Sequence, residues 1–121
     1  MKDQLQQIIE GEDVVLFMKG TPQFAMCGNS QRALDALRRA GAPVTAVDIL
    51  PDPAIRQELS ALSGWPTIPQ VFVRGELIGG ADIVEEQAAS GELAQKLEQA
   101  LGADYRGAGD ERVVDVLAPV A

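Results

Sequence analysis

The sequence contains no histidine and only one cysteine, Cys27, among its 121 residues. Without histidine, a cysteine protease and a metal site built from cysteine and histidine are both excluded, because no imidazole is present to act as a base or a ligand. Ser30 stands three residues after Cys27, so the chain also lacks the C-x-x-C pair of dithiol redox proteins. The lone thiol must therefore act with an external partner thiol, or with a metal centre that it shares with other molecules.

Positive charge and long apolar runs are also scarce. The chain has 10 Lys and Arg against 18 Asp and Glu, a formal net charge of −8, which argues against a nucleic-acid or anionic-membrane surface. Apolar runs such as VVLFM are far shorter than the ~20 residues of a membrane-spanning helix. The first residues carry no apolar signal-peptide core, and a lone thiol suits a reducing compartment. We therefore expect a cytoplasmic protein, with a trimmed organelle form left open.

The hydrophobic pattern of the chain, which is 46% hydrophobic, predicts a single α/β domain. The first half is predicted to contain a helix at 2–10, a strand in 13–20, a helix at 29–40 and a strand in 42–50. The second half is predicted to contain a helix at 51–63 capped by Asp52, and then a hairpin of strands 70–73 and 76–79. A helix capped by Asp82 and a helix at 92–101 follow. A β-α-β unit followed by a hairpin indicates a small mixed four-stranded sheet flanked by helices, a thioredoxin-like fold. This domain is expected over residues 1–102. Residues 103–121 are expected to form a flexible tail, with RVVDVL as an alternative short strand or docking segment.

Cys27 lies between the first predicted strand and the first long helix. The backbone N–H groups and the dipole at a helix N-terminus stabilise a thiolate and lower a cysteine pKa from its usual ~8.5. Lys19, at the end of the preceding strand, adds a positive charge on the same side. Cys27 is therefore a candidate nucleophile or metal ligand that needs no histidine. The alternative is an inert buried thiol, which is the common fate of free cysteines.

Two further motifs are candidates for ligand binding. In GWPTIPQVF, Pro69 precedes a strand, where a cis X–Pro bond can leave backbone groups exposed to a ligand; a rigid start of the strand is the alternative. In IGGADIVEE, backbone N–H groups at Ala81 can hold a carboxylate while Asp82 holds an amine; an ordinary turn is the alternative. A thioredoxin-like fold brings both motifs and Cys27 to one edge of the sheet. With Lys19 and Arg56, this combination suits a short thiol peptide with carboxylates and one amine.

Three blocks carry a resemblance to a known family: MKGTPQFAMCGNS, DILPDPAIRQEL and GWPTIPQVFVRGELIGGADIV. Together they resemble a monothiol glutaredoxin of the CGFS class over about residues 3–102. The resemblance implies a thioredoxin fold with an added N-terminal helix, with glutathione and a [2Fe–2S] cluster as cofactors. It also implies site residues: Cys27 as the catalytic and iron-ligating residue, and a glutathione-binding set of Lys19, Arg56, Ile68 (before a cis Pro69), Ala81 and Asp82.

The number of thiolates bears on the assembly that the resemblance implies. A [2Fe–2S] cluster needs four thiolate ligands and this chain offers one, so two chains and two glutathiones would complete the set. The resemblance thus implies a monomer without the cluster, a homodimer with it, and transfer of the cluster to iron–sulfur acceptor proteins, with BolA-like proteins as partners. A second hypothesis is a glutathione-dependent thiol-disulfide oxidoreductase that removes glutathione from proteins through Cys27. A third is a degenerate relative that keeps the fold and only binds a partner.

The sequence departs from the family pattern at three positions. Asn29 replaces the Phe of the CGFS motif, Ala25 replaces a common proline, and Ala81 replaces the Cys or Ser that often follows Gly-Gly. Asn29 matters most, because the missing ring removes apolar cover beside the thiol.

Overall fold

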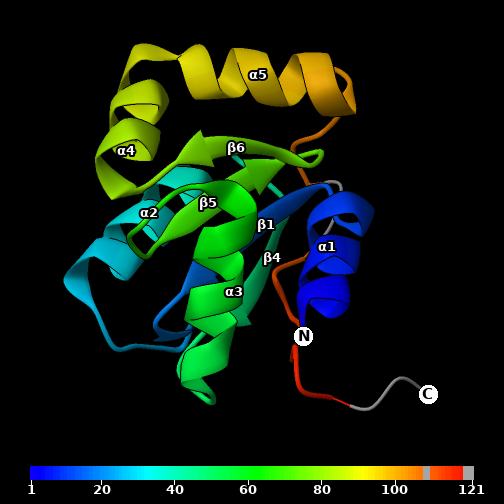
Figure 1. The fold of residues 1–121 in the computed structure, drawn as a ribbon. Helices are drawn as coiled ribbons and strands as arrows, with labels where there is room; N and C mark the ends of the chain where they lie inside the picture. The colour runs from blue at the N-terminus through cyan, green and yellow to red at the C-terminus, as the bar shows by residue number, and fades with distance from the viewer. Residues whose placement is uncertain (108–109, 119–121) are drawn as a thin grey trace.

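A mixed sheet of five strands forms the centre of the structure, a computed structural model that describes residues 1–107 and 110–118 (Figure 1). In spatial order the strands are β6 (Glu76–Gly79), β5 (Gln70–Val73), β1 (Val14–Met18), β4 (Val44–Asp48) and β7 (Arg112–Val113). The helices are α1 (Lys2–Gly11), α2 (Gly28–Arg39), α3 (Pro53–Ser63), α4 (Ala81–Ser90) and α5 (Glu92–Leu101). β1 is parallel to β4 and antiparallel to β5. The thioredoxin-like fold is thus confirmed, with one strand more than the four predicted.

Strand β1 is buried along its whole length and divides the core in two. Val14, Leu16 and Met18 pack into the cluster that includes residues of α2, α4 and α5. Val15 and Phe17 point to the opposite face, toward residues of α1 and α3. Helices therefore cover both faces of the sheet (Figure 1), which explains why β1 reads as a continuous apolar run instead of an alternating one.

A local signal in the sequence fixes the start of α3, but not that of α4. Asp52 caps α3 by accepting a hydrogen bond from the Ala54 N–H at 2.9 Å, and Pro53 follows it, as predicted. The predicted cap of α4 is wrong by two residues. The Val84 N–H donates to the Gly80 carbonyl at 3.1 Å, so Gly80 is the N-cap and Asp82 lies inside the first turn.

Among the described residues, no helix is long and apolar enough to cross a membrane.

A short hairpin that the sequence did not predict precedes α2. It consists of β2 (Gly20–Thr21) and β3 (Phe24–Ala25), which pair in antiparallel fashion. Gly20 has φ +92°, and any Cβ at this position would collide with the Phe24 carbonyl and with Met26. The tight turn and its glycine therefore determine the path by which the chain reaches α2.

The segment after α5, predicted as a flexible tail, packs on the domain where the structure describes it. The buried Tyr105 hydroxyl donates to the Ala40 carbonyl at 2.9 Å, and Val116 joins the core beside α1. β7 pairs with β4, which agrees with the alternative of a short strand within RVVDVL. Residues 108–109 and 119–121, which belong to the same predicted tail, lie outside the described residues.

Candidate functional site

Cys27 is the N-cap residue of α2 and is partly exposed, with extended backbone angles of φ −152° and ψ 133°. The pKa of its thiol lies below the ordinary value. The main cause is the backbone N–H of Ser30, which stabilises the thiolate as a hydrogen-bond donor; the N–H of Asn29 and the charge of Lys19 add smaller effects, and burial opposes them. The structure therefore places the thiol where the sequence predicted, at the positive end of a helix, and not fully buried as the alternative required.

Ser30 holds residues 19–27, which lead to the cysteine and which we call the thiol loop, in place from inside the molecule. Its side chain is fully buried, and its hydroxyl accepts a hydrogen bond from the Lys19 N–H at 3.0 Å. The Lys19 carbonyl in turn accepts from the Met26 N–H at 2.8 Å, next to the cysteine. The position where a dithiol protein would carry its second cysteine thus has a structural role that sequence reasoning missed.

Lys19 and Arg56 line one of two cavities beside the thiol loop. This cavity measures about 700 Å³, and we call it the basic cavity. Its other lining residues are Ile49, Leu50, Pro53, Gln57, Ser60 and Pro66. Two cations in a largely apolar surround favour an anionic group such as a carboxylate.

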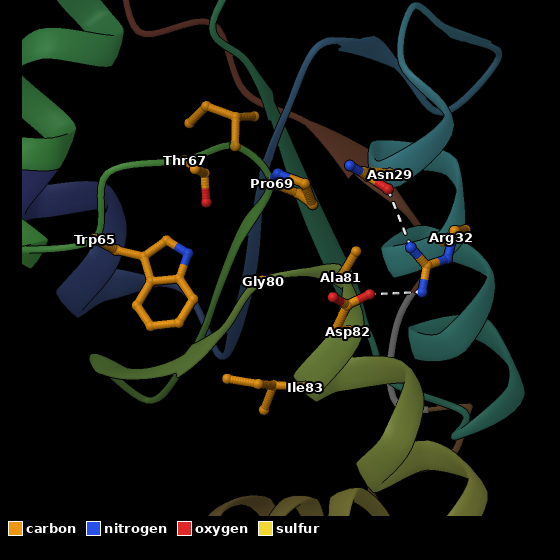
Figure 2. Close-up of a pocket in the computed structure, with 10 residues that line it drawn as sticks. Asn29, Arg32, Trp65, Thr67, Pro69, Gly80, Ala81, Asp82 and Ile83 are labelled. Atoms are coloured by element: carbon orange, nitrogen blue, oxygen red, sulfur yellow. Dashed lines mark hydrogen bonds and ion pairs between the residues drawn. The ribbon is translucent and has the colours of Figure 1, made fainter.

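The second cavity measures about 250 Å³, and we call it the acidic cavity (Figure 2). Ile68, Ala81 and Asp82 line it, together with Asn29, Arg32, Trp65, Thr67, Pro69, Gly80 and Ile83. The peptide bond between Ile68 and Pro69 is cis, as predicted. No turn, loop or cap hydrogen bond within the described backbone uses the amide or carbonyl of Ile68. Ala81 is the first residue of α4, so this cavity also receives the N-terminal N–H groups of a helix.

The segment from Trp65 to Pro69 forms a wall between the two cavities. Pro66 lines the basic cavity, whereas Trp65 and Thr67 line the acidic one. Gln70, fully buried, holds this wall by donating from Nε2 to the carbonyls of Trp65 at 2.9 Å and Thr67 at 3.2 Å. No periodicity in the sequence indicated this role of Gln70.

The site residues predicted from the sequence are therefore divided between the two cavities. Lys19 and Arg56 lie at one, and Ile68, Ala81 and Asp82 at the other. Cys27 lines neither, but it is next to Lys19 through the hydrogen-bonded thiol loop and two residues from Asn29 in the acidic cavity. The thiol is thus connected through Lys19 to the cavity with two cations and through Asn29 to the cavity with a carboxylate.

One ion-pair network was not predicted. Arg32 of α2 donates from Nη2 to Asp82 Oδ1 at 2.8 Å and from Nη1 to Asn29 Oδ1 at 3.1 Å (Figure 2). It also makes a two-point contact with Glu85. Positions 29 and 32 are far from 82 and 85 in the chain, so only the packing of α2 against α4 brings them together.

The fold and the site define a class of protein: a thioredoxin-like domain that presents a single activated thiol at the start of a helix. Comparison with known families supports this and narrows it, since the family model described as Glutaredoxin matches residues 14–78. The chain belongs to the glutaredoxin family, and its single cysteine and its relatives make it a monothiol member.

Curated relatives are similar over most of this chain. It is 45% identical over 97 residues to Glutaredoxin 4 of Haemophilus ducreyi, which covers 80% of this chain and 91% of that protein. It is 46% identical over 99 residues to Monothiol glutaredoxin-S11 of Oryza sativa, and 43% identical over 101 residues to the chloroplastic Monothiol glutaredoxin-S14 of Arabidopsis thaliana. Those alignments cover 82% and 84% of this chain, but the chain spans only 20% and 58% of the two plant proteins.

Solved structures share the fold. The solution structure of reduced poplar apo GrxS14 is 43% identical, with a TM-score of 0.73 over 83% of this chain and 92% of that one. The crystal structure of a buckwheat glutaredoxin–glutathione complex is 27% identical, with a TM-score of 0.71 over 82% of this chain and 88% of that one.

Proposed function

We propose that the chain binds glutathione across the two cavities that flank Cys27. Glutathione carries a carboxylate at its glycine end, and an ammonium and a carboxylate at its γ-glutamyl end. The basic cavity offers Lys19 and Arg56 to the first end. The acidic cavity offers Asp82 and the N-terminus of α4 to the second. The observation that carries this proposal is the pair of cavities near Cys27, one lined by two cations and the other by a carboxylate and a helix N-terminus.

Ile68 completes the proposed glutathione site. Its amide and carbonyl take no part in the turn, loop and cap hydrogen bonds of the described backbone, so they are placed to pair with the cysteinyl residue of the peptide. Ala81 lies at the first position of α4, where its N–H has no partner within the helix and can donate to the γ-glutamyl carboxylate. The buckwheat relative, which is described as a complex with glutathione, supports glutathione as the ligand.

We further propose that Cys27 holds a [2Fe–2S] cluster at the interface of a homodimer. The donors present fit such a group only if other molecules contribute. A cluster needs four thiolates, the chain has one cysteine, and the described residues contain no group of three or more potential metal ligands. Cys27 from each of two chains and the thiols of two glutathiones supply the set. When bound, the cluster provides a cargo that acceptor proteins can receive.

The surface around Cys27 suits an assembly of this kind. Phe24 and Met26, immediately before the cysteine, expose 77% and 69% of their surface, which is unusual for large apolar side chains. The lowered pKa of Cys27 keeps a larger fraction of thiolate available as a ligand at neutral pH. On this proposal the chain is a cytoplasmic CGFS-class protein with Asn29 in place of Phe. It is a monomer without the cluster, and its partners are BolA-like proteins and iron–sulfur acceptor proteins.

Anaerobic reconstitution with iron, sulfide and glutathione tests the proposal. We expect visible charge-transfer absorption and a shift from monomer to dimer on sizing, and we expect both to be lost in Cys27→Ser. The matched control is wild-type protein reconstituted without glutathione, which should give neither signal. A colourless monomer in the presence of glutathione would contradict the proposal.

A second candidate function follows from the same thiol. Cys27 is partly exposed and its pKa is lowered, as a nucleophile requires. The Cys27 thiolate would attack the glutathione sulfur of a glutathionylated protein and release the protein thiol. A second glutathione would then attack the Cys27–glutathione disulfide, giving glutathione disulfide and regenerated thiolate. Rapid turnover in a coupled deglutathionylation assay, without cluster binding, would favour this function over the first.

A further inference from the structure

Arg32 is the most fully engaged side chain at the rim of the acidic cavity. Nε and Nη2 donate to the two carboxylate oxygens of Glu85 at 3.1 and 3.0 Å, Nη2 also donates to Asp82, and Nη1 donates to Asn29 (Figure 2). A guanidinium has five N–H groups, so four are used. The carboxylate of Asp82, which the proposed function assigns to the ligand's ammonium group, is thus already paired with a cation of the protein.

We propose that Arg32 is a specificity-determining residue, which sets how strongly the acidic cavity favours a ligand that carries an ammonium group. The inference rests on the proposed function, because it takes Asp82 as the partner of that ammonium. An arriving ammonium meets a carboxylate whose Oδ1 is already paired with Arg32, so part of the negative charge that would attract it is already offset. The pairing therefore weakens discrimination between a γ-glutamyl group and the same group without its amine.

The charges at the rim support the direction of this effect. Asp82 and Glu85 carry two negative charges and Arg32 one positive charge, so the three together carry −1. Without Arg32 they would carry −2 and attract an ammonium more strongly. The Asp82 side chain is 90% exposed, so solvent screening limits the effect to a few-fold change in affinity.

Glu85 and Asn29 keep Arg32 in this position. A two-point guanidinium–carboxylate contact fixes orientation as well as distance. The same contact with Arg32 lowers the pKa of Glu85 from its ordinary value. Asn29 accepts from the remaining nitrogen, Nη1. The asparagine that replaces the phenylalanine of the CGFS motif therefore helps to orient Arg32 through this hydrogen bond.

The test compares two ligands in NMR titrations of the full chain, which suit weak affinities. The ligands are reduced glutathione and deaminoglutathione, in which hydrogen replaces the γ-glutamyl ammonium. The measured quantity is the ratio of their dissociation constants, deaminoglutathione over glutathione. Both ligands carry the γ-glutamyl carboxylate, so any effect of Arg32 on that group cancels in this ratio. The ratio therefore reports the contribution of the ammonium group alone.

In Arg32→Gln we expect the ratio to rise about two- to fivefold, because Asp82 becomes free for the ammonium. In Glu85→Gln we expect it to fall, because the rim loses a negative charge while Arg32 is left to Asp82. The matched control is Arg38→Gln on the same helix, whose partners Asp35 and Glu111 line neither cavity, and its ratio should equal that of wild type.

Opposite shifts in the two variants support the inference, since a loosened structure would move both ratios the same way. An unchanged or lower ratio in Arg32→Gln, or equal shifts in both variants, overturns it while leaving glutathione binding intact. If wild-type protein binds neither ligand, the proposed function itself fails and the inference fails with it. All variants change exposed or half-exposed side chains, and their amide spectra report directly whether each is folded.

Discussion

The two cavities beside Cys27 differ in whether their charged side chains already have ion-pair partners. In the basic cavity, Lys19 and Arg56 have no ion-pair partner among the described residues and face a largely apolar surround. In the acidic cavity, Asp82 is already paired with Arg32. Under the proposed function, a ligand carboxylate would meet two cations at one end, whereas a ligand ammonium at the other end would meet a carboxylate already paired with Arg32. This difference predicts that the basic cavity provides affinity and that the acidic cavity adjusts selectivity.

The largest effect on binding should come from the basic cavity. We expect Arg56→Gln to weaken glutathione binding about five- to tenfold, because it removes a charge-assisted contact to the glycine carboxylate. NMR titration measures the dissociation constant. The matched control is Arg74→Gln. Arg74 is an exposed arginine in the turn between β5 and β6, it pairs with Asp13, and it lines neither cavity. Equal losses in the two variants would contradict the assignment of Arg56.

The next effect concerns the support shared by the basic cavity and the thiol. We expect Ser30→Ala to lower the free energy of unfolding by about 1–2 kcal/mol, because it leaves the Lys19 N–H without its buried acceptor. Urea denaturation measures this loss. Ser90→Ala, at an exposed helix end, is the control and should change stability much less. A stability equal to that of wild type would mean that Ser30 does not hold the loop.

A smaller effect is expected at the acidic cavity. Asp82→Asn should weaken glutathione binding only about two- to threefold, because Arg32 already offsets the charge that is removed. The same titration provides the value. A loss larger than that of Arg56→Gln would reverse the comparison and make the acidic cavity the main source of affinity.

The smallest effect is on the titration of the thiol. The pKa of Cys27 is lowered mainly by backbone N–H groups and only in part by Lys19, so Lys19→Gln should raise it slightly. Because the thiolate is the reactive form, the pH profile of alkylation by iodoacetamide should move to higher pH, with a lower rate at neutral pH. Arg74→Gln again serves as the control. A profile that does not move would assign the lowered pKa to the helix backbone alone.

The sequence predicted those parts of the fold that have strong local signals. The continuous apolar run of β1, the capped start of α3 and the Arg-Gly turn of the hairpin each depend on a few adjacent residues. The missed hairpin of β2 and β3 has two-residue strands, which are too short to show any periodicity. The sequence predicts the fifth strand, β7, only as an alternative, because its pairing with β4 depends on contacts between distant parts of the chain.

The candidate site shows the same division. Cys27 was identified from its place before a helix, and Ile68 was implied by the resemblance to the monothiol glutaredoxins. Arg32 could not be identified in this way, because its partner Asp82 is 50 positions away and belongs to another helix. The exact start of α4 was also missed, since a glycine cap offers no side chain to recognise, whereas Asp82 resembles a cap residue.

The pairing of β7 with β4 also bears on self-association. In the described part of the sheet β4 would be an edge strand without β7, and unpaired backbone groups at an edge can recruit another chain. Arg112 and Val113 occupy the groups opposite Thr45 and Ala46, and an ion pair between Arg112 and Glu12 fastens the cover from outside. The segment that contains β7 thus covers the backbone groups through which β4 could otherwise recruit another chain.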